Sequence, residues 1–311
     1  MKVYLTEKIH DDALSFLRAH FEVICGYLLP EDDRAAAMAE SDGVLVRSAQ
    51  ITAEMIEQMP KLKVIAKHGI GVDNIDVEAA GKRAVKVVNA PLANVNAVAE
   101  HTVALLFAAS KRLCYLDRRV RSGGFAERGL WLNTELAGRT VGLVGFGKIA
   151  RLVAKKLSAL DMEILTSDPY CDLDAAKALN VQCVEMDELL SRSDFVSLHT
   201  PLMPATRAMV NEAFLRKMKP SAVLINASRG GVVDEAALIR ALKEQIIAGA
   251  ALDVFDPEPP RPDNPLFSME QVVLSPHNAA LTDRAMLAMS MDSAAGVCDV
   301  LEGRAPRFPV N

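Results

Sequence analysis

The sequence predicts an α/β protein with two doubly wound parallel-sheet domains, and three observations support this prediction. Short apolar runs typical of buried strands recur about every twenty residues, and segments with helical spacing of apolar residues lie between them. A glycine-rich turn follows one such run near the middle of the chain. The length of 311 residues and the hydrophobic content of 50% are sufficient for two domains with substantial cores. Alternating strands and helices therefore predict parallel sheets covered by helices.

The first half of the chain carries five predicted strands but no glycine fingerprint for a dinucleotide, so it is the candidate substrate domain. The strands are expected at 3–5, 22–24, 44–46, 63–66 and 85–88, and amphipathic helices at 12–19 and 52–59. A long helix predicted at 96–112 is apolar around more than one face. We expect this helix to be buried between domains or between subunits.

The central motif is a strand at 141–144, a turn through Gly145 and Gly147, and a helix that continues to residue 160. Strand, glycine turn and helix form the context in which such a pattern indicates a dinucleotide site. Gly145 permits the tight turn, Gly147 lets the backbone approach a pyrophosphate, and Ala150 lets the helix pack closely on the strand. A tight turn without a ligand is the alternative interpretation of the glycines alone.

Asp168, at the end of a strand predicted at 163–167, strengthens the cofactor interpretation. It lies about twenty residues after the glycine turn, where a carboxylate holds the adenosine ribose hydroxyls. A carboxylate here repels a 2′-phosphate and no arginine follows it directly, so the sequence favours NAD over NADP. The alternative is that Asp168 is a turn residue before Pro169.

Polar residues follow three consecutive strands of the second half. Strands are predicted at 181–184, 195–198, 223–226, 248–253 and 272–274, with helices from near 186, 212 and 234 and a last helix at 283–301. Arg229, Glu258 and His277 come after the last three strands, so we expect them to converge at one edge of the sheet. An arginine can grip a carboxylate and polarise a carbonyl, and a histidine oriented by a glutamate can exchange a proton during hydride transfer. Each residue alone could be an ordinary loop residue, but their joint placement favours a catalytic site.

Two loops of the first half are candidates for binding an anionic substrate. Arg47 follows a predicted strand at its carboxyl end. Lys67 precedes a loop in which Gly69, Ile70 and Gly71 present backbone N–H groups. The alternative for Arg47 and Lys67 is a solvated loop cation.

Composition argues against several classes of protein. The net charge of −5, with both signs scattered, argues against a nucleic-acid partner, and no apolar run approaches the ~20 residues that span a bilayer. The five cysteines include no Cys-x-x-Cys pair, which argues for free thiols and against a structural metal site. Together with an N-terminus unlike a signal peptide, these features predict a cytoplasmic protein without a membrane partner.

Several motifs together resemble the D-isomer-specific 2-hydroxyacid dehydrogenase family over essentially the full length of the chain. They are Gly69-Ile-Gly-Val-Asp-Asn-Ile-Asp76, Ala99-Glu-His101, Gly142-Leu-Val-Gly-Phe-Gly147, His199-Thr-Pro-Leu202, Asn226-Ala-Ser-Arg-Gly230, Ala251-Leu-Asp-Val-Phe255 and Ser275-Pro-His277. The similarity is greatest to the phosphoglycerate dehydrogenase and hydroxypyruvate reductase branches. It implies a flavodoxin-like substrate domain at 1–95 plus 284–311, a Rossmann domain for NAD at 96–283 inserted in it, and a homodimer formed through the cofactor domain.

The resemblance also implies roles for individual residues. Arg229, Glu258 and His277 match the family's catalytic residues. NAD would contact Gly145, Gly147, Lys148, Ile149, Asp168, Thr200, Pro201, Thr206, Ala227, Asp253 and His277. The substrate would contact Arg47, Lys67, Gly69, Ile70, Gly71, Asn94 and Arg229.

We therefore expect an NAD-dependent oxidoreductase that interconverts a small 2-oxo acid and its D-2-hydroxy acid. Phosphohydroxypyruvate, hydroxypyruvate and glyoxylate are the candidate 2-oxo acids. A formate- or phosphite-type dehydrogenase is one alternative, although formate dehydrogenases resemble the pattern with Gln in place of Glu258. An NAD(H)-sensing binding protein or corepressor is the other, because such a protein would keep the same residues.

Overall fold

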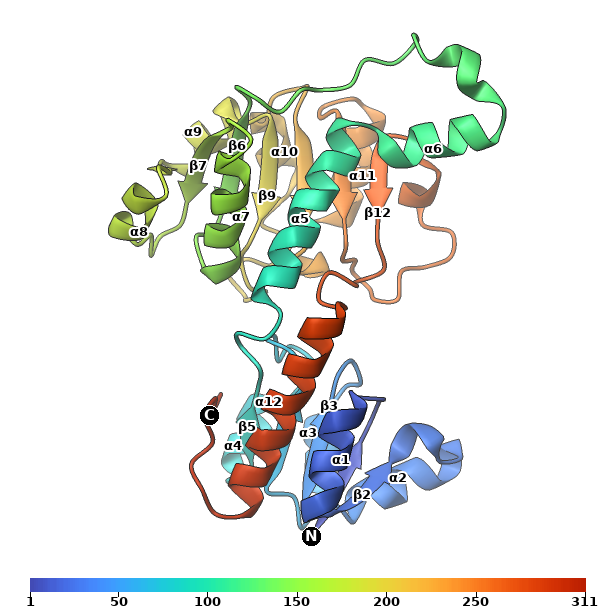
Figure 1. Cartoon of the computed structure of the whole chain (residues 1–311), viewed down its shortest axis with the longest axis vertical. Coiled ribbons are helices and arrows are strands. Elements are labelled where there is room, and N and C mark those ends of the chain that lie inside the picture. Colours follow the sequence, from blue (N-terminus) through green and yellow to red (C-terminus); the bar gives the residue numbers. More distant parts are fainter. The chain divides into compact units, whose positions relative to one another are not determined.

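The computed structural model describes all 311 residues, and they form two compact units. Unit 1 contains Met1–Val95 and Ala280–Asn311, and unit 2 contains Asn96–Ala279. Each unit is a parallel sheet with helices on both faces (Figure 1), which confirms the predicted α/β class with two doubly wound sheets. Residues 280–283, which we predicted with the cofactor half, group with unit 1 because they lead directly into its last helix.

Unit 1 is built on a five-stranded parallel sheet in the order β2-β1-β3-β4-β5. Its strands are β1 (Lys2–Leu5), β2 (Glu22–Cys25), β3 (Gly43–Val46), β4 (Val64–Lys67) and β5 (Lys86–Val88). Its helices are α1 (Asp11–His20), α2 (Glu31–Ala39), α3 (Ala53–Glu57), α4 (Val77–Lys82) and α12 (Asp283–Leu301), with a 3₁₀ turn η1 (Gly26–Leu28). The winding direction reverses between β1 and β3, as it does in flavodoxin-like sheets.

Side chains of β1 alternate between the two faces of this sheet. Val3 and Leu5 belong to an apolar cluster with α1 and α12, whereas Tyr4 belongs to a second cluster with α3 and α4. The C-terminal tail stays in the same unit, because the Val310 N–H donates to the carbonyl of Val87 in β5 at 2.8 Å. The last helix and tail thereby complete the sheet unit that the first 95 residues begin.

Unit 2 is built on a seven-stranded parallel sheet in the order β12-β11-β10-β9-β6-β7-β8. Its strands are β6 (Thr140–Val144), β7 (Glu163–Ser167), β8 (Gln182–Cys183), β9 (Phe195–Leu198), β10 (Val223–Asn226), β11 (Gly249–Leu252) and β12 (Val272–Leu274). Its helices are α5 (Val95–Ser110), α6 (Leu113–Arg121), α7 (Lys148–Ser158), α8 (Leu173–Ala178), α9 (Met186–Arg192), α10 (Glu212–Lys217) and α11 (Glu235–Lys243). Three 3₁₀ turns complete it: η2 (Gly124–Glu127), η3 (Gly230–Val232) and η4 (Pro265–Ser268).

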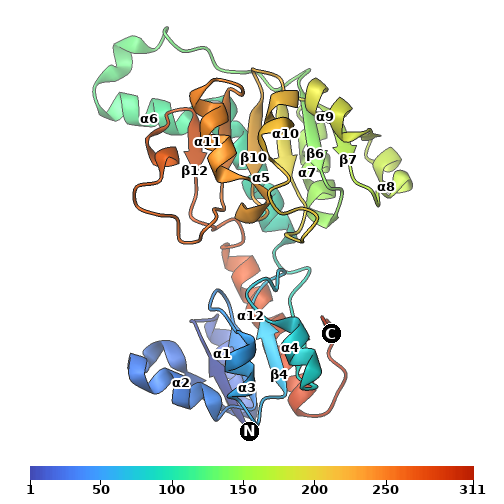
Figure 2. The ribbon, with the colours of Figure 1, turned by 180° about the vertical axis from the view of Figure 1, so that it is seen from behind.

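Helices cover both faces of the sheet in unit 2. Apolar residues of α5, α7 and α8 pack on one face (Figure 1), and those of α9, α10 and α11 pack on the other, which Figure 2 shows from behind. Helix α5 places Ala99, Leu105 and Leu106 in the first of these cores, and its burial between domains or between subunits stays a prediction. All five cysteines are unpaired, and the structure has no helix that is both long enough and apolar enough to span a membrane.

Candidate functional site

The winding direction of the sheet in unit 2 reverses between β6 and β9, which is where open α/β sheets bind ligands. The glycine turn follows β6, and His199 and Thr200 follow β9. Gly145 has φ of +93°, a conformation that favours glycine, and a Cβ on it would lie 3.0 Å from the His199 carbonyl oxygen. The two chain segments that flank the switch point are therefore in close backbone contact.

Gly147 has a different environment, because no atom beyond its adjacent residues lies within 4 Å of the position that its Cβ would take. Its φ of −74° suits any residue. Gly147 is the N-cap of α7, which begins with Lys148 and Ile149. The first N–H groups of a helix have no partner within the helix and carry a partial positive charge. Open space in front of this helix terminus fits the pyrophosphate of the predicted cofactor.

Asp168 is bonded directly to the glycine turn. Its Oδ2 accepts the Phe146 N–H at 2.7 Å, and its Oδ1 accepts the Tyr170 N–H at 2.8 Å. Each carboxylate oxygen can accept a further hydrogen bond, such as one from a ribose hydroxyl. The carboxylate thus shapes its own turn, as the alternative interpretation held, and can still serve a ligand.

The segment after β9 holds two of the predicted cofactor contacts. Thr200 Oγ1 is buried without a hydrogen-bond partner, which is costly unless a ligand supplies one. Thr206 Oγ1 donates to the Pro201 carbonyl at 2.6 Å and accepts the Met203 N–H at 2.9 Å, so it closes the loop on itself. These residues, together with the open helix terminus, fit a dinucleotide.

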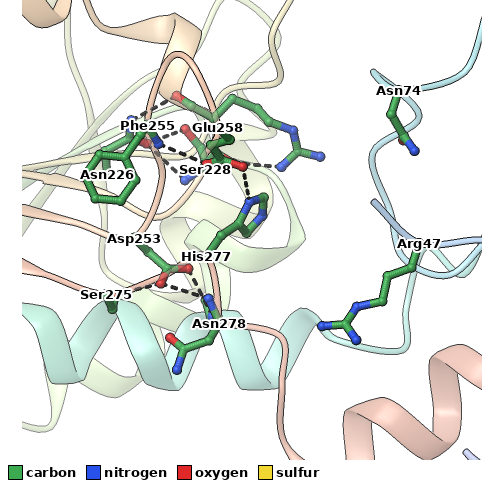
Figure 3. A network of polar contacts seen from close by, with 12 residues as sticks. Arg47, Asn74, Asn226, Ser228, Asp253, Phe255, Glu258, Ser275, His277 and Asn278 are labelled. Atoms are coloured by element: carbon green, nitrogen blue, oxygen red, sulfur yellow. Dashed lines mark hydrogen bonds and ion pairs between the residues drawn. The ribbon is translucent and has the colours of Figure 1, made fainter. Parts of the chain in front are cut away.

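His277 and Glu258 form a close pair (Figure 3). His277 Nδ1 lies 2.7 Å from Glu258 Oε2, and Glu258 Oε1 accepts the Phe255 N–H at 2.9 Å. Burial opposes ionisation of Glu258, but the hydrogen bonds from His277 and Phe255 outweigh it and hold the pKa of Glu258 below its ordinary value. Because Nδ1 faces the carboxylate, Nε2 is the nitrogen that is left to exchange a proton with a substrate.

The surroundings of this pair are apolar and strained. A cavity of about 430 Å³ adjoins His277 and Glu258, and its wall includes Phe255, Phe267 and Leu274. The pair itself remains open to solvent, with 48% of the His277 side chain and 35% of the Glu258 side chain exposed. His277 has φ of +50°, in the left-handed region that costs energy for a residue other than glycine. Strain of this kind clusters at functional sites, and here it accompanies the residue predicted to handle the proton.

Arg229 lies in the turn after β10, and Asn226 at the end of that strand shapes this turn. Asn226 Nδ2 donates to the Arg229 carbonyl at 2.9 Å, and Asn226 Oδ1 accepts from the Ser228 N–H and O–H at 3.0 and 2.8 Å (Figure 3). A Cβ on the next residue, Gly230, would lie 1.8 Å from the Phe255 carbonyl oxygen. The turn of Arg229 and the loop of Glu258 are therefore in direct backbone contact, so the three predicted catalytic residues come together in unit 2.

Asp253, which we predicted at the nicotinamide, is 1% exposed and bonded within the protein. Its Oδ1 accepts the Ser275 O–H at 2.6 Å and the Asn278 N–H at 3.0 Å, and its Oδ2 accepts the Ala279 N–H at 3.0 Å (Figure 3). Burial opposes its ionisation, but hydrogen bonds from His101, Ser275 and the two amides outweigh it and keep the pKa of Asp253 below its usual value. Asp253 anchors the loop that carries His277, and its contact with a cofactor stays a prediction, as does that of the half-buried Ala227.

In unit 1, the loop of Arg47 lies at the switch point between β1 and β3, and Glu7 holds it. The carboxylate of Glu7 accepts the N–H groups of Arg47, Ser48 and Ala49 at 2.9, 2.7 and 2.8 Å. Burial opposes ionisation of Glu7, but hydrogen bonds from Thr6, Arg47 and Ser48 outweigh it and lower the pKa of Glu7. We did not predict this role, because the sequence alone does not indicate which donors meet a lone glutamate.

Lys67 joins the two predicted substrate loops. Its Nζ donates to the Arg47 carbonyl and to Asn74 Oδ1, both at 2.5 Å (Figure 3 labels Arg47 and Asn74). Gly69 follows with φ of +144°, and Asn89 Nδ2 donates to the Ile70 carbonyl at 2.8 Å, ahead of Gly71. The structure therefore brings Arg47, Lys67 and the glycine loop together within unit 1.

Asn94 also lies in unit 1 and is buried. Its Nδ2 lies 3.5 Å from the sulfur of Met289, and its Oδ1 is buried without a hydrogen-bond partner. A buried carbonyl oxygen without a donor is costly. This orphaned acceptor fits a ligand group that donates a hydrogen bond, which is consistent with the predicted contact to a substrate.

The chain is similar to 2-hydroxyacid dehydrogenases both in a family model and in curated relatives. Residues 103–279 match the family model described as D-isomer specific 2-hydroxyacid dehydrogenase, NAD binding domain. D-3-phosphoglycerate dehydrogenase 2, chloroplastic, of Arabidopsis thaliana is 40% identical over 312 residues, which cover 100% of this chain and 50% of the plant protein. The chain spans about half the length of the curated relatives that it matches.

Solved structures resemble the chain over its whole length. The TT0316 protein from Thermus thermophilus is 34% identical, with a TM-score of 0.88 and 100% of both chains covered. An acyclic imino acid reductase (Bsp5), solved in complex with NADPH and D-Arg, is 30% identical, again with a TM-score of 0.88 and 100% of both chains covered.

Proposed function

Since the chain belongs to the D-isomer-specific 2-hydroxyacid dehydrogenase family and contains its NAD-binding domain, we propose that it interconverts a small 2-oxo acid and its D-2-hydroxy acid. The pair formed by His277 and Glu258, next to the turn of Arg229, is the observation that carries this proposal. NADH, when bound, supplies the hydride for reduction of the 2-oxo group. Backbone N–H groups at Gly147, Lys148 and Ile149 would hold its pyrophosphate, and Asp168 would hold its adenosine ribose.

The side chains then divide the remaining work. Arg229 binds the substrate carboxylate and polarises the neighbouring carbonyl. The protonated imidazole of His277 gives its Nε2 proton to the carbonyl oxygen as the hydride arrives at carbon. Glu258 holds the ring in place through Nδ1 and stabilises its positive charge. In the oxidative direction, the neutral imidazole accepts the hydroxyl proton.

The substrate we propose carries a second anionic or polar group, with phosphohydroxypyruvate, hydroxypyruvate and glyoxylate as candidates. Support comes from Arg47 and the glycine loop at the carboxyl edge of the sheet in unit 1, and from the similarity to the plant D-3-phosphoglycerate dehydrogenase. Lys67 is bonded to the Arg47 carbonyl and to Asn74, so we assign it to shaping the loop and Arg47 to the direct contact.

The first test is oxidation of NADH by the purified chain with each candidate 2-oxo acid and with pyruvate, repeated with NADPH. Preference for phosphohydroxypyruvate with NADH supports Arg47 as a phosphate contact. Turnover of hydroxypyruvate or glyoxylate instead supports general steering of carboxylates. Binding of NADH without turnover of any acid would refute the proposed activity and favour an NAD(H)-sensing protein.

Replacement of Arg229 tests the catalytic assignment. Arg229→Ala removes a preorganised charge at the reacting carbonyl, which costs about 2–4 kcal/mol of transition-state stabilisation. We therefore expect kcat/KM to fall by roughly 30- to 900-fold. Arg240→Ala is the matched control, because Arg240 is an arginine of α11 outside this site. An unchanged kcat/KM in Arg229→Ala contradicts the assignment.

We further propose a homodimer in a reducing compartment such as the cytoplasm. The segment after α6 extends from unit 2 (Figure 1) and exposes apolar side chains, with Leu130 71% and Leu132 91% exposed. Large apolar side chains that are exposed near one another in the chain suit an interface, and the five unpaired cysteines suit a reducing environment. Light scattering, which gives the molar mass in solution, tests the dimer. We expect the double variant Leu130→Glu with Leu132→Glu to be monomeric. A molar mass equal to that of the wild-type dimer would exclude this segment as the interface.

A further inference from the structure

A histidine outside the catalytic pair is bonded to the loop that carries His277. His101 lies in α5, and its Nε2 is 2.9 Å from Ser275 Oγ and 3.4 Å from Asp253 Oδ1. Ser275 has one hydroxyl proton, which it donates to Asp253 Oδ1 at 2.6 Å. The Ser275 oxygen must therefore accept from His101, so Nε2 of His101 carries a proton. A single N–H thus points at both the hydroxyl and the carboxylate.

The two groups that His101 meets are the anchors of the catalytic loop. The His277 N–H donates to the Asp253 carbonyl at 2.7 Å, and the N–H groups of Asn278 and Ala279 donate to the Asp253 carboxylate, both at 3.0 Å. The Ser275 N–H donates to the Leu252 carbonyl at 2.9 Å. The loop around the strained His277 is therefore fixed residue by residue to the end of β11, and His101 braces this anchor from a separate helix.

We propose that His101 is a positioning residue, which through Ser275 and Asp253 fixes the loop that presents the His277 imidazole to the substrate. This inference rests on the proposed function, because it assigns His277 the proton transfer. His101 need not touch the substrate. A shift of the reacting group by about 1 Å can cost on the order of 100-fold in rate, so a brace of this kind acts on the chemical step.

Two substitutions of similar size separate the positioning bond from general packing. In His101→Gln the amide nitrogen can occupy the place of Nε2 and keep a donor for Ser275. In His101→Asn the amide nitrogen corresponds to Nδ1 and stops short of Ser275. We expect His101→Asn to lower kcat by roughly 10- to 100-fold with little change in the Kd of NADH, and His101→Gln to stay within a few-fold of the wild type.

A double-mutant cycle provides a second readout. If His101 acts through Ser275, then His101→Asn should cost little more once Ser275→Ala is present, because the acceptor is already gone. The primary isotope effect with deuterated NADH should rise in His101→Asn, since the hydride step becomes slower. Equal activity of the Gln and Asn variants, or full additivity with Ser275→Ala, overturns the proposal.

A measurement without turnover distinguishes failure of this inference from failure of the proposed function. Hydrogen exchange of the peptide that contains Asn278 and Ala279 should be faster in His101→Asn than in the wild type, and close to wild type in His101→Gln. If no 2-oxo acid is turned over but this exchange pattern appears, the proposed activity fails and the brace stands. If exchange is the same in all three proteins, the brace is refuted whatever the activity.

Discussion

Gly147→Ala separates the contribution of this glycine to folding from its contribution to cofactor binding. No atom beyond the adjacent residues lies within 4 Å of the position of the new methyl group, and the φ of −74° suits alanine. Alanine at a compatible position stabilises by about 0.4–1 kcal/mol through the unfolded chain, but it is a poorer N-cap than glycine by a similar amount. The two effects nearly cancel, so the free energy of unfolding should change by less than about 1 kcal/mol.

Binding of NADH should respond differently to the same methyl group. The methyl group would occupy the space in front of the N-terminus of α7, where we place the pyrophosphate. A hydrogen bond to a charged group contributes about 1.5–3 kcal/mol, so loss of one backbone contact to a phosphate should raise the Kd of NADH by roughly 10- to 150-fold.

The assay combines urea denaturation with titration of NADH fluorescence. Gly129→Ala is the matched control, because its Cβ also meets nothing within 4 Å while no cofactor contact is predicted there. An unchanged Kd in Gly147→Ala refutes the placement of the pyrophosphate. A loss of stability well above 1 kcal/mol would show instead that Gly147 is required for folding.

Two further predictions concern stability. Gly230→Ala should destabilise the protein by about 3 kcal/mol or more and abolish turnover, because the new Cβ would lie 1.8 Å from the Phe255 carbonyl oxygen. Thermal unfolding checks this prediction, and a Tm equal to that of the wild type contradicts it. Burial, aided by the charges of Arg47 and Lys67, lowers the pKa of His68 to about 4 from 6.5, so between these pH values the unfolded chain binds a proton that the folded chain does not. The free energy of unfolding should therefore fall as the pH drops from 6.5 towards 4, by up to about 1.4 kcal/mol per pH unit from this group. Denaturation at pH 7 and pH 5 should show a smaller change in this free energy for His68→Gln than for the wild type. The same change in both proteins contradicts the prediction.

The sheets and the grouping of the three candidate catalytic residues were predictable because their signals are short-range. Buried parallel strands are continuous apolar runs, and every predicted strand matches the observed one to within one residue at each end. Once the strands are known, the residues that follow them must share an edge, which is how Arg229, Glu258 and His277 could be grouped before any coordinates. Strand β8 is shorter than predicted because it is an exposed edge strand of two residues.

Some helices and long-range hydrogen bonds have no comparable short-range signal in the sequence. Helix α2 buries none of its residues, so no apolar periodicity marks it, although Glu31, Asp32 and Asp33 in its first turn suit a helix N-terminus. Helix α6 and the 3₁₀ turn η2 were not among the predicted elements. The hydrogen bonds of Glu7 join residues about forty positions apart, and which buried donor meets which acceptor depends on packing that the local sequence does not contain.

Glycines illustrate why motif and structure must be combined. In the sequence, Gly147 and Gly230 both follow strands of unit 2 in motifs that resemble the same family. In the structure, Gly230 is required by a neighbouring backbone, whereas the space beside Gly147 is open. Contact with the protein explains the first glycine completely, so it carries no information about a ligand. Nothing in the protein itself restricts the second, so the space beside it leaves room for the cofactor that we propose at the helix terminus.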